Sequence, residues 1–136
     1  MRELSLHILD IIQNSIAAEA DLIKLKITED YEADQLVIKI IDNGSGMDQE
    51  TQKQVVDPFV TSRTTREVGL GLPLFKEAAE QCAGEFELES EVGVGTELKA
   101  VFQHSHIDRA PLGDIVGTII SFLVSNPDID LLYQHQ

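Results

Sequence analysis

Asp42-Asn43-Gly44-Ser45-Gly46-Met47 follows an apolar run at residues 36–41 and opens a polar segment. An acidic residue at a strand end, followed by two glycines one residue apart, places a carboxylate beside backbone that a ligand can approach closely. The pair Asn43-Gly44 is also a strong signal for a tight hairpin turn, so an ordinary turn is the alternative interpretation.

A second glycine-rich stretch, Gly69-Leu70-Gly71-Leu72, opens a helix predicted over residues 72–83. Free N–H groups and the positive end of the helix dipole make such a turn a good phosphate site. A carboxylate that accepts hydrogen bonds and a turn that binds anions together indicate a nucleotide site. For the glycines of this turn alone, a flexible joint is the alternative.

The segment before this turn, residues 59–68, contains Thr61, Ser62, Arg63, Thr64, Thr65 and Arg66. Hydroxyl and guanidinium groups are suited to phosphate oxygens. The segment is a local concentration of positive charge in a very acidic chain and directly precedes the glycine turn, which indicates a phosphate contact. A solvated loop is the alternative interpretation.

The first predicted helix carries an apolar stripe and a polar face. The stripe consists of Leu4, Ile8, Ile11, Ser15 and Ala18, which recur at helical spacing. His7, Asp10 and Asn14 align on another face. Because Asp and Asn are poor residues for a helix interior, their alignment indicates a site that needs these groups, with an ordinary solvated face as the alternative.

The predicted elements alternate hairpins with helices. The order is a helix from residue 4, strands at 22–28 and 35–41, a short helix at 48–54 that Asp48 can cap, a loop, a helix at 72–83, strands at 85–91 and 96–102, and a tail. Hairpins separated by helices do not form a doubly wound parallel sheet. The sequence therefore predicts an α+β fold, a two-layer α/β sandwich with a mixed, mostly antiparallel sheet and helices on one face.

Composition limits the possible partners and compartment. The 136 residues include 24 acidic and 10 basic ones, for a net charge of −14, which repels nucleic acids and anionic membranes. The single cysteine, Cys82, permits no internal disulfide and fits a reducing compartment. We find no secretory signal, and the longest apolar run, residues 115–124, is far shorter than the ~20 residues of a membrane span. We therefore expect a cytoplasmic protein.

Five motifs in a fixed order carry a family resemblance, although the common nucleotide fingerprints such as GxxxxGK[ST] are absent. They are Asp10-x-x-x-Asn14-Ser15, Asp42-x-Gly44-x-Gly46, Asp57-Pro58-Phe59-x-Thr61, Gly69-Leu70-Gly71-Leu72 and Gly95-Thr96. With these motifs the chain resembles the histidine-kinase-like ATPase domain, the GHKL or Bergerat-fold superfamily of gyrase, Hsp90, histidine kinases and MutL. The resemblance covers residues 4–102, and residues 58–102 are most similar to the bacterial histidine-kinase branch.

The resemblance implies a site for ATP and Mg²⁺. Asp42 would accept a hydrogen bond from the adenine amino group with help from Thr96, and Asn14 would coordinate Mg²⁺, which prefers oxygen ligands. Gly44 and Gly46 would let the chain close on the base and ribose. Further nucleotide-binding residues implied by the motifs are Met47, Phe59, Thr61, Arg63, Gly69, Leu70, Gly71 and Leu72.

Two positions depart from the family pattern. Asp10 stands where ATP-hydrolysing members usually carry a glutamate that polarises the attacking water, and Ala17 stands where Lys or Asp is frequent. Only nine residues precede Asp10, so we expect no dimerisation helix with a phosphoacceptor histidine before the domain. The resemblance then implies two-component-like bacterial signalling, with a stand-alone kinase acting on a protein supplied in trans. The alternatives are an ATP-hydrolysing module and a non-catalytic, nucleotide-dependent one.

The tail is treated as an addition to the domain. We assign residues 1–103 to the ATP-binding domain and residues 104–136 to a helical C-terminal extension. The stripe of Leu112, Ile115, Val116, Ile119, Ile120 and Leu123 predicts a helix that contacts the domain edge, a protein partner or a second copy of the chain. His104, His106 and Asp108 suggest a metal site, for which a solvated linker is the alternative.

Overall fold

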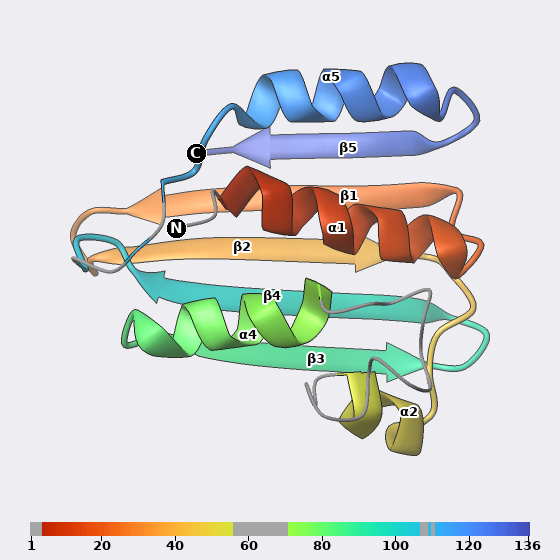
Figure 1. Cartoon of the computed structure of the whole chain (residues 1–136), viewed down its shortest axis with the longest axis horizontal. Helices are drawn as coiled ribbons and strands as arrows, with labels where there is room; N and C mark the ends of the chain where they lie inside the picture. The colour runs from red at the N-terminus through yellow and green to blue at the C-terminus, as the bar shows by residue number, and fades with distance from the viewer. Residues whose placement is uncertain (1–3, 56–70, 107–108, 110) are drawn as a thin grey trace.

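The computed structural model describes residues 4–55, 71–106, 109 and 111–136. Its strands are β1 (Leu22–Asp30), β2 (Gln35–Asp42), β3 (Glu85–Glu91), β4 (Gly95–Gln103) and β5 (Asp130–His135). They form one sheet in the order β3-β4-β2-β1-β5 (Figure 1). Strand β5 runs parallel to β1, whereas the other three neighbouring pairs are antiparallel. The sheet is therefore mixed and mostly antiparallel, as predicted.

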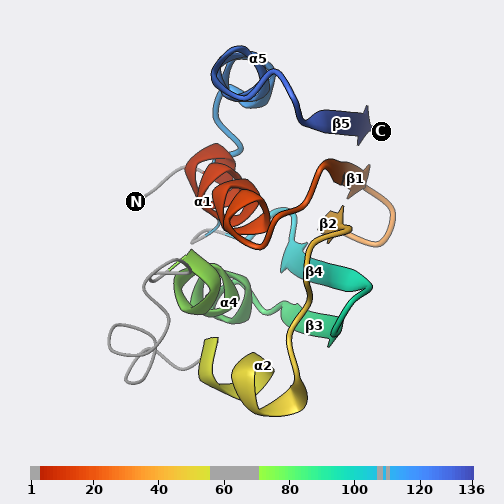
Figure 2. The ribbon, with the colours of Figure 1, turned by 90° about the vertical axis from the view of Figure 1, so that its right-hand side faces the viewer.

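The described helices are α1 (Leu4–Ala17), α2 (Gln49–Val55), α4 (Gly71–Gln81) and α5 (Ile115–Ser125). Figure 2 shows α1, α4 and α5 side by side on one face of the sheet, with α2 beyond the edge strand β3. No described helix covers the opposite face. This arrangement confirms the predicted two-layer α+β sandwich.

The sheet buries one face of each strand because apolar and polar residues alternate along it. In β1, Ile23, Leu25 and Ile27 are buried while Lys24 and Lys26 are exposed. The neighbouring strands add their own buried residues, which are Leu36, Ile38 and Ile40 from β2 and Leu98, Ala100 and Phe102 from β4. In β3 the glutamates at 85, 87, 89 and 91 are exposed, as their alternation predicts.

Helix α1 buries a wider surface than its apolar stripe indicates. Ile12 is buried beside the stripe, and so is His7, which is only 6% exposed. The His7 ring centroid lies 5.7 Å from that of Phe75 of α4. The polar face expected from the sequence therefore divides, because His7 joins the interior while Asp10 and Asn14 stay half-buried.

The loop after β2 leads into α2 through the predicted cap. The Asp48 carboxylate accepts a hydrogen bond of 2.8 Å from the backbone N–H of Thr51. This bond lowers the pKa of Asp48 from its usual value of 3.8, because it stabilises the charged form. Asp48 therefore satisfies one of the N–H groups that a helix start leaves open.

The tail contributes both a helix and a strand to the fold. Ile115, Ile119 and Phe122 of α5 are buried in the same cluster as the core residues of the strands. Strand β5 pairs with β1 from Leu22↔Asp130 to Ile27↔His135. The predicted helix is thus present at the edge of the domain, and the chain after it supplies the fifth strand.

Candidate functional site

Asp42 lies at the end of β2, in a row of polar residues that crosses three strands. It stands opposite Thr96 of β4, and Thr96 stands opposite Ser90 of β3. The register of the sheet thus brings together two residues that the sequence predicted for the site, although they are far apart in the chain. Ser90 was not predicted, because in the sequence it is only one polar position in an alternating strand.

Two hydrogen bonds fix the carboxylate of Asp42. The Ser15 hydroxyl of α1 donates to its Oδ2 at 2.7 Å, and the backbone N–H of Gly44 donates to its Oδ1 at 2.9 Å. Each oxygen therefore has one donor and retains a lone pair for another. The half-buried carboxylate is held as an oriented acceptor for a hydrogen-bond donor. Ser15 belongs to the first motif, yet its bond to a residue 27 positions away cannot be predicted from the local sequence.

Ser90 connects the loop after β2 to β4. Its hydroxyl accepts from the N–H of Met47 at 2.8 Å, and it donates to the carbonyl of Gly95 at 2.9 Å. The Thr96 hydroxyl lies 2.8 Å from Ser90 Oγ. With the Ser90 proton on Gly95, Thr96 donates to Ser90 and keeps only acceptor capacity. Asp42 and Thr96 then both present acceptors to a ligand.

Close packing of the backbone explains why two positions of this region are glycine. A Cβ on Gly46 would lie 2.0 Å from the carbonyl oxygen of Glu91, and one on Gly95 would lie 2.0 Å from that of Asp42. Both also have positive φ, at 74° and 141°, which residues with a side chain rarely adopt. These glycines let the loop after β2 pack directly against the turn between β3 and β4.

Asp10 and Asn14 lie one helical turn apart on α1, and Asn14 immediately precedes the Ser15 that bonds Asp42. The end of α1 is also tied to the loop, because the N–H of Ser45 donates to the carbonyl of Ala18 at 2.7 Å. Among the described residues, the buried Nδ2 of Asn14 has no hydrogen-bond partner. An amide N–H group without a partner, on the residue that precedes Ser15, can complete its bonding with an acceptor atom of a ligand.

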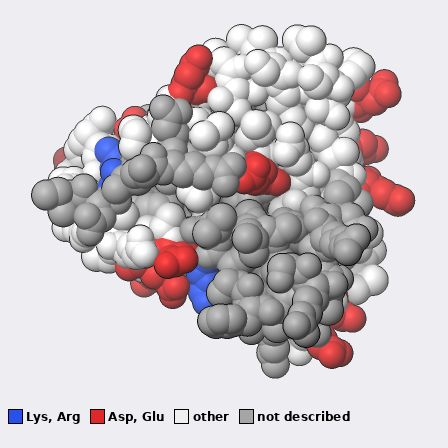
Figure 3. Space-filling view, viewed as in Figure 1, with Lys and Arg blue, Asp and Glu red and all other residues white. Residues whose placement is uncertain are grey.

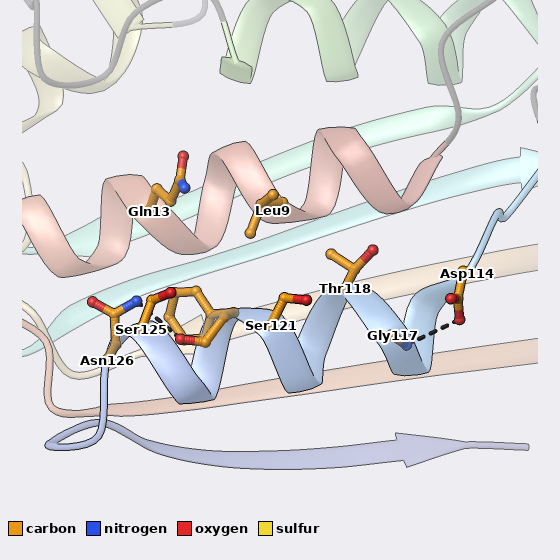
Figure 4. A pocket seen from close by; sticks show the side chains of 9 residues that line it. Leu9, Gln13, Asp114, Gly117, Thr118, Ser121, Ser125 and Asn126 are labelled. Atoms are coloured by element: carbon orange, nitrogen blue, oxygen red, sulfur yellow. Dashed lines mark hydrogen bonds between the residues drawn. The ribbon is translucent and has the colours of Figure 1, made fainter.

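Two cavities border these elements. One of about 360 Å³ lies beside Asp42 and Thr96, and it is also lined by Glu89 and Glu97, which belong to the helix-free face. Its carboxylates make it unsuitable for phosphate. The other, of about 480 Å³, is a groove between α1 and α5 lined by Gln13, Thr118 and Ser121 among others (Figure 4). Neither cavity joins Asp42 to Asn14.

Several predicted site residues fall outside the described part of the chain. They are Phe59, Thr61, Arg63, Gly69 and Leu70. Gly71 is the first residue of α4 and Leu72 follows it, which agrees with the predicted helix start to within one residue. Met47 is half-buried, and its backbone N–H donates to the hydroxyl of Ser90.

The oxygen donors of α1 fit the magnesium ion that the resemblance implies. Mg²⁺ takes hard oxygen ligands, usually one or two from protein together with substrate phosphates. On α1, the half-buried side chain of Asn14 offers an amide oxygen of this kind.

A metal site at His104, His106 and Asp108 is not supported, because the described residues contain no group of three His, Cys, Asp or Glu that could hold an ion. His104 instead lies 3.1 Å from a Glu29 oxygen, and Asp108 is outside the described part. Within the same described ranges, no helix is both long and apolar enough to cross a membrane.

Comparison with known proteins places these features in a family. Residues 2–106 match the profile of the family described as "Histidine kinase-, DNA gyrase B-, and HSP90-like ATPase". Over 91 residues, or 67% of this chain, the sequence is 35% identical to sporulation kinase D of Bacillus subtilis. Over 93 residues, or 68% of the chain, it is 34% identical to sporulation kinase C of the same bacterium. The matched parts are 18% and 22% of those two proteins, so the chain spans only a small part of them.

The fold has a solved counterpart. The structure described as the Aquifex aeolicus MutL ATPase domain complexed with ADP matches with a TM-score of 0.67 at 17% identity. The match covers 99% of this chain and 60% of that one. At this identity the likeness is one of fold. The profile covers well over half of the sequence, and the chain therefore belongs to the histidine kinase-, DNA gyrase B- and HSP90-like ATPase family.

Proposed function

We propose that this domain binds Mg-ATP at the end of β2 and transfers the γ-phosphoryl group to a protein supplied in trans. The observation that carries the proposal is the Asp42 carboxylate, whose two oxygens are oriented by Ser15 and Gly44 beside Thr96. Such an acceptor pair suits the amino group of adenine. The relatives that are sporulation kinases, and the ADP complex of MutL, favour a nucleotide as the ligand.

The remaining residues then have distinct tasks. Asn14 on α1 would hold the magnesium ion, which neutralises phosphate charge when bound. Asp10 would accept the proton of the attacking hydroxyl or water. Gly71 at the start of α4 would place free backbone N–H groups near the phosphates. Phe59, Thr61, Arg63, Gly69 and Leu70 complete the proposed nucleotide contacts.

We place this activity in the bacterial cytoplasm, as part of two-component-like signalling, because the sporulation kinases C and D come from a bacterium. The net charge of −14 favours proteins over nucleic acids or anionic membranes as partners.

We further propose that a second copy of the chain covers the outer flank of α5. Val116, Ile120 and Val124 are spaced four residues apart and are 57%, 56% and 77% exposed. The flank facing α1 is polar instead, with Thr118, Ser121 and Ser125. Because α5 contains no charged residue, and the surface over it is white in Figure 3, two molecules of net charge −14 meet little local repulsion there.

Incubation with γ-labelled ATP and Mg²⁺ tests the function directly. The protein is incubated alone and with extract of its source cells. Label on another protein supports the kinase. Free phosphate without labelled protein supports the ATPase alternative. Nucleotide binding with neither product leaves a non-catalytic regulatory module, and no binding of ATP or ADP refutes the proposal.

A further inference from the structure

The helix-free face of the sheet carries a row of lysines. Lys26 of β1 stands opposite Lys39 of β2, and Lys39 stands opposite Lys99 of β4. Lys24 lies on the same face, two residues along β1 from Lys26. These residues, Lys24, Lys26, Lys39 and Lys99, are called the lysine patch here. They are four of the chain's six lysines, in a protein with 24 acidic and 10 basic residues.

The fold does not explain this row. Like charges directly opposite on neighbouring strands are destabilising. Only Lys39 has an ion pair, with Glu97 at 3.0 Å; Lys24, Lys26 and Lys99 have none within 4 Å among the described residues. Lys99 stands opposite Glu87 of β3, so the β4 end of the row faces a carboxylate of its own chain. At the β1 end, Lys24 and Lys26 have no carboxylate within 4 Å among the described residues, and a partner can supply the counter-charge there.

The surroundings of the patch restrict what can bind. Neighbouring strands lie ~4.8 Å apart, so the row spans about 10 Å. It is bordered on β3 by the exposed column of Glu85, Glu87, Glu89 and Glu91, and on β5 by Asp130. A nucleic-acid duplex or an anionic bilayer extends over a larger area and would place phosphates against these carboxylates. Lys24 and Lys26 on β1 are three strand spacings, or ~14 Å, from the glutamates of β3. Because charges farther than ~8 Å are largely screened at physiological ionic strength, a short acidic segment lying along β1 and β2 senses these lysines more than the glutamates of β3.

Apolar side chains complete the surface. Val37 and Val101 are paired across β2 and β4 on one side of the Lys39–Lys99 row, and Ile41 lies on the other side of that row on the same face. All three are half-buried and so are partly accessible. A protein segment with carboxylates and small apolar side chains matches this combination of lysines and valines better than a bare polyanion does.

We propose that the lysine patch is a docking surface for an acidic segment of a partner protein. The surface lies on the opposite side of the sheet from α1, so an occupant leaves Asp42, Ser15 and Asn14 accessible to a nucleotide. The segment is held by carboxylate–ammonium contacts across β1, β2 and β4, and the partner is thereby tethered to the domain independently of the nucleotide site.

Binding of labelled short poly-L-glutamate, measured by fluorescence anisotropy, tests this proposal. The variant Lys26→Gln/Lys39→Gln/Lys99→Gln removes the row, and Lys76→Gln on α4 removes one lysine from the other side of the sheet. Exposed ion pairs contribute ~0.2–1 kcal/mol each, so we expect the triple variant to bind about threefold to a hundredfold more weakly. Lys76→Gln should bind like wild type, and added salt should weaken the wild-type complex.

Unfolding midpoints accompany each measurement. Because the triple variant removes like-charge contacts, we expect it to remain folded; Lys26→Gln alone, which preserves the Lys39–Glu97 pair, is the second variant if it does not. Equal binding by wild type and the variants, or no binding of poly-L-glutamate to wild type, overturns the proposal. Tighter lysine-dependent binding of duplex DNA or phosphatidylserine vesicles also overturns it, in favour of a phosphate-bearing partner.

Discussion

At the scale of single residues, we expect nucleotide binding to depend on the Asp42 carboxylate, which an amide cannot replace. Asp42→Asn leaves one acceptor oxygen where two donors, Ser15 and the N–H of Gly44, now point. A hydrogen bond to a charged group contributes ~1.5–3 kcal/mol, so we expect ATP affinity to fall about tenfold to a hundredfold. Calorimetric titration measures it, with the exposed Asp128→Asn as control. Unchanged affinity would remove Asp42 from the adenine contact.

Asp10 should affect turnover rather than binding. A general base contributes ~10²–10⁴-fold, and the amide of Asp10→Asn keeps the shape of the side chain without its proton affinity. We expect ATP affinity to stay within a few-fold while phosphoryl transfer or hydrolysis is lost. Asp10→Glu, which restores the longer acid, should retain turnover. Equal turnover by wild type and Asp10→Asn would exclude the role of a base.

Gly46 and Gly93 form a matched pair that tests how tightly the loop after β2 is packed. Both have positive φ. A Cβ added to Gly46 would lie 2.0 Å from the carbonyl oxygen of Glu91, whereas one added to Gly93 would have no atom within 4 Å. Alanine in the left-handed region costs ~1–2 kcal/mol at either position. Gly46→Ala should lose clearly more stability in urea unfolding than Gly93→Ala. Equal losses would show that the loop can move away from Glu91.

At the scale of elements, one carboxylate ties β5 and the end of β4 to β1. Glu29 accepts from His104 at 3.1 Å through Oε1 and from His135 at 3.0 Å through Oε2. The hydrogen bond with His104, followed by that with His135, lowers the pKa of Glu29 from 4.5 despite partial desolvation. A depressed pKa means that the unfolded state binds the proton more tightly, so the stabilisation is present above pH 4.5. It is lost as the pH falls through the folded value.

The variant Glu29→Gln should therefore be less stable than wild type above about pH 4.5. We expect this stability gap to close under more acidic conditions, because the wild type then loses its charged contact. Urea unfolding midpoints across this range measure it. Glu32→Gln, an exposed residue in the turn after β1, is the control and should parallel wild type. A gap that persists in acid would contradict the assignment.

Local pattern was sufficient for much of the fold. Alternation predicted the hairpins β1–β2 and β3–β4, Asp48 was recognised as a helix cap, and Asp42 was located at a strand end. Contacts between segments that are distant in the sequence could not be predicted from the local pattern. The bond from Ser15 to Asp42, the pairing of β5 with β1, and the row of Lys26, Lys39 and Lys99 all depend on strand order and register. No local sequence signal specifies those for strands that are not neighbours in the chain.

At the scale of the whole molecule, we expect the outer flank of α5 to decide the oligomeric state. Ile120→Asp places a charge in the exposed stripe, and in a dimer it would face its own copy. We expect wild type to sediment as a dimer and Ile120→Asp as a monomer. Ser121→Asp adds the same charge on the flank that faces α1, so it should remain dimeric. A wild type that is monomeric at all concentrations refutes the second copy as the occupant.

The parallel pairing of β1 with β5 has a consequence for the order in which the molecule forms. The partners Leu22 and Asp130 are separated by most of the sequence, whereas β1 and β2 are joined by a short turn. Contacts between residues far apart in the sequence form slowly, because the chain loses loop-closure entropy before the contact contributes any stabilisation. During synthesis, β1 and β2 can pair long before the ribosome has added residues 130–135. Until then the edge of β1 that later pairs with β5 has free N–H and C=O groups. Such an edge can pair with another chain, so aggregation is favoured during this interval.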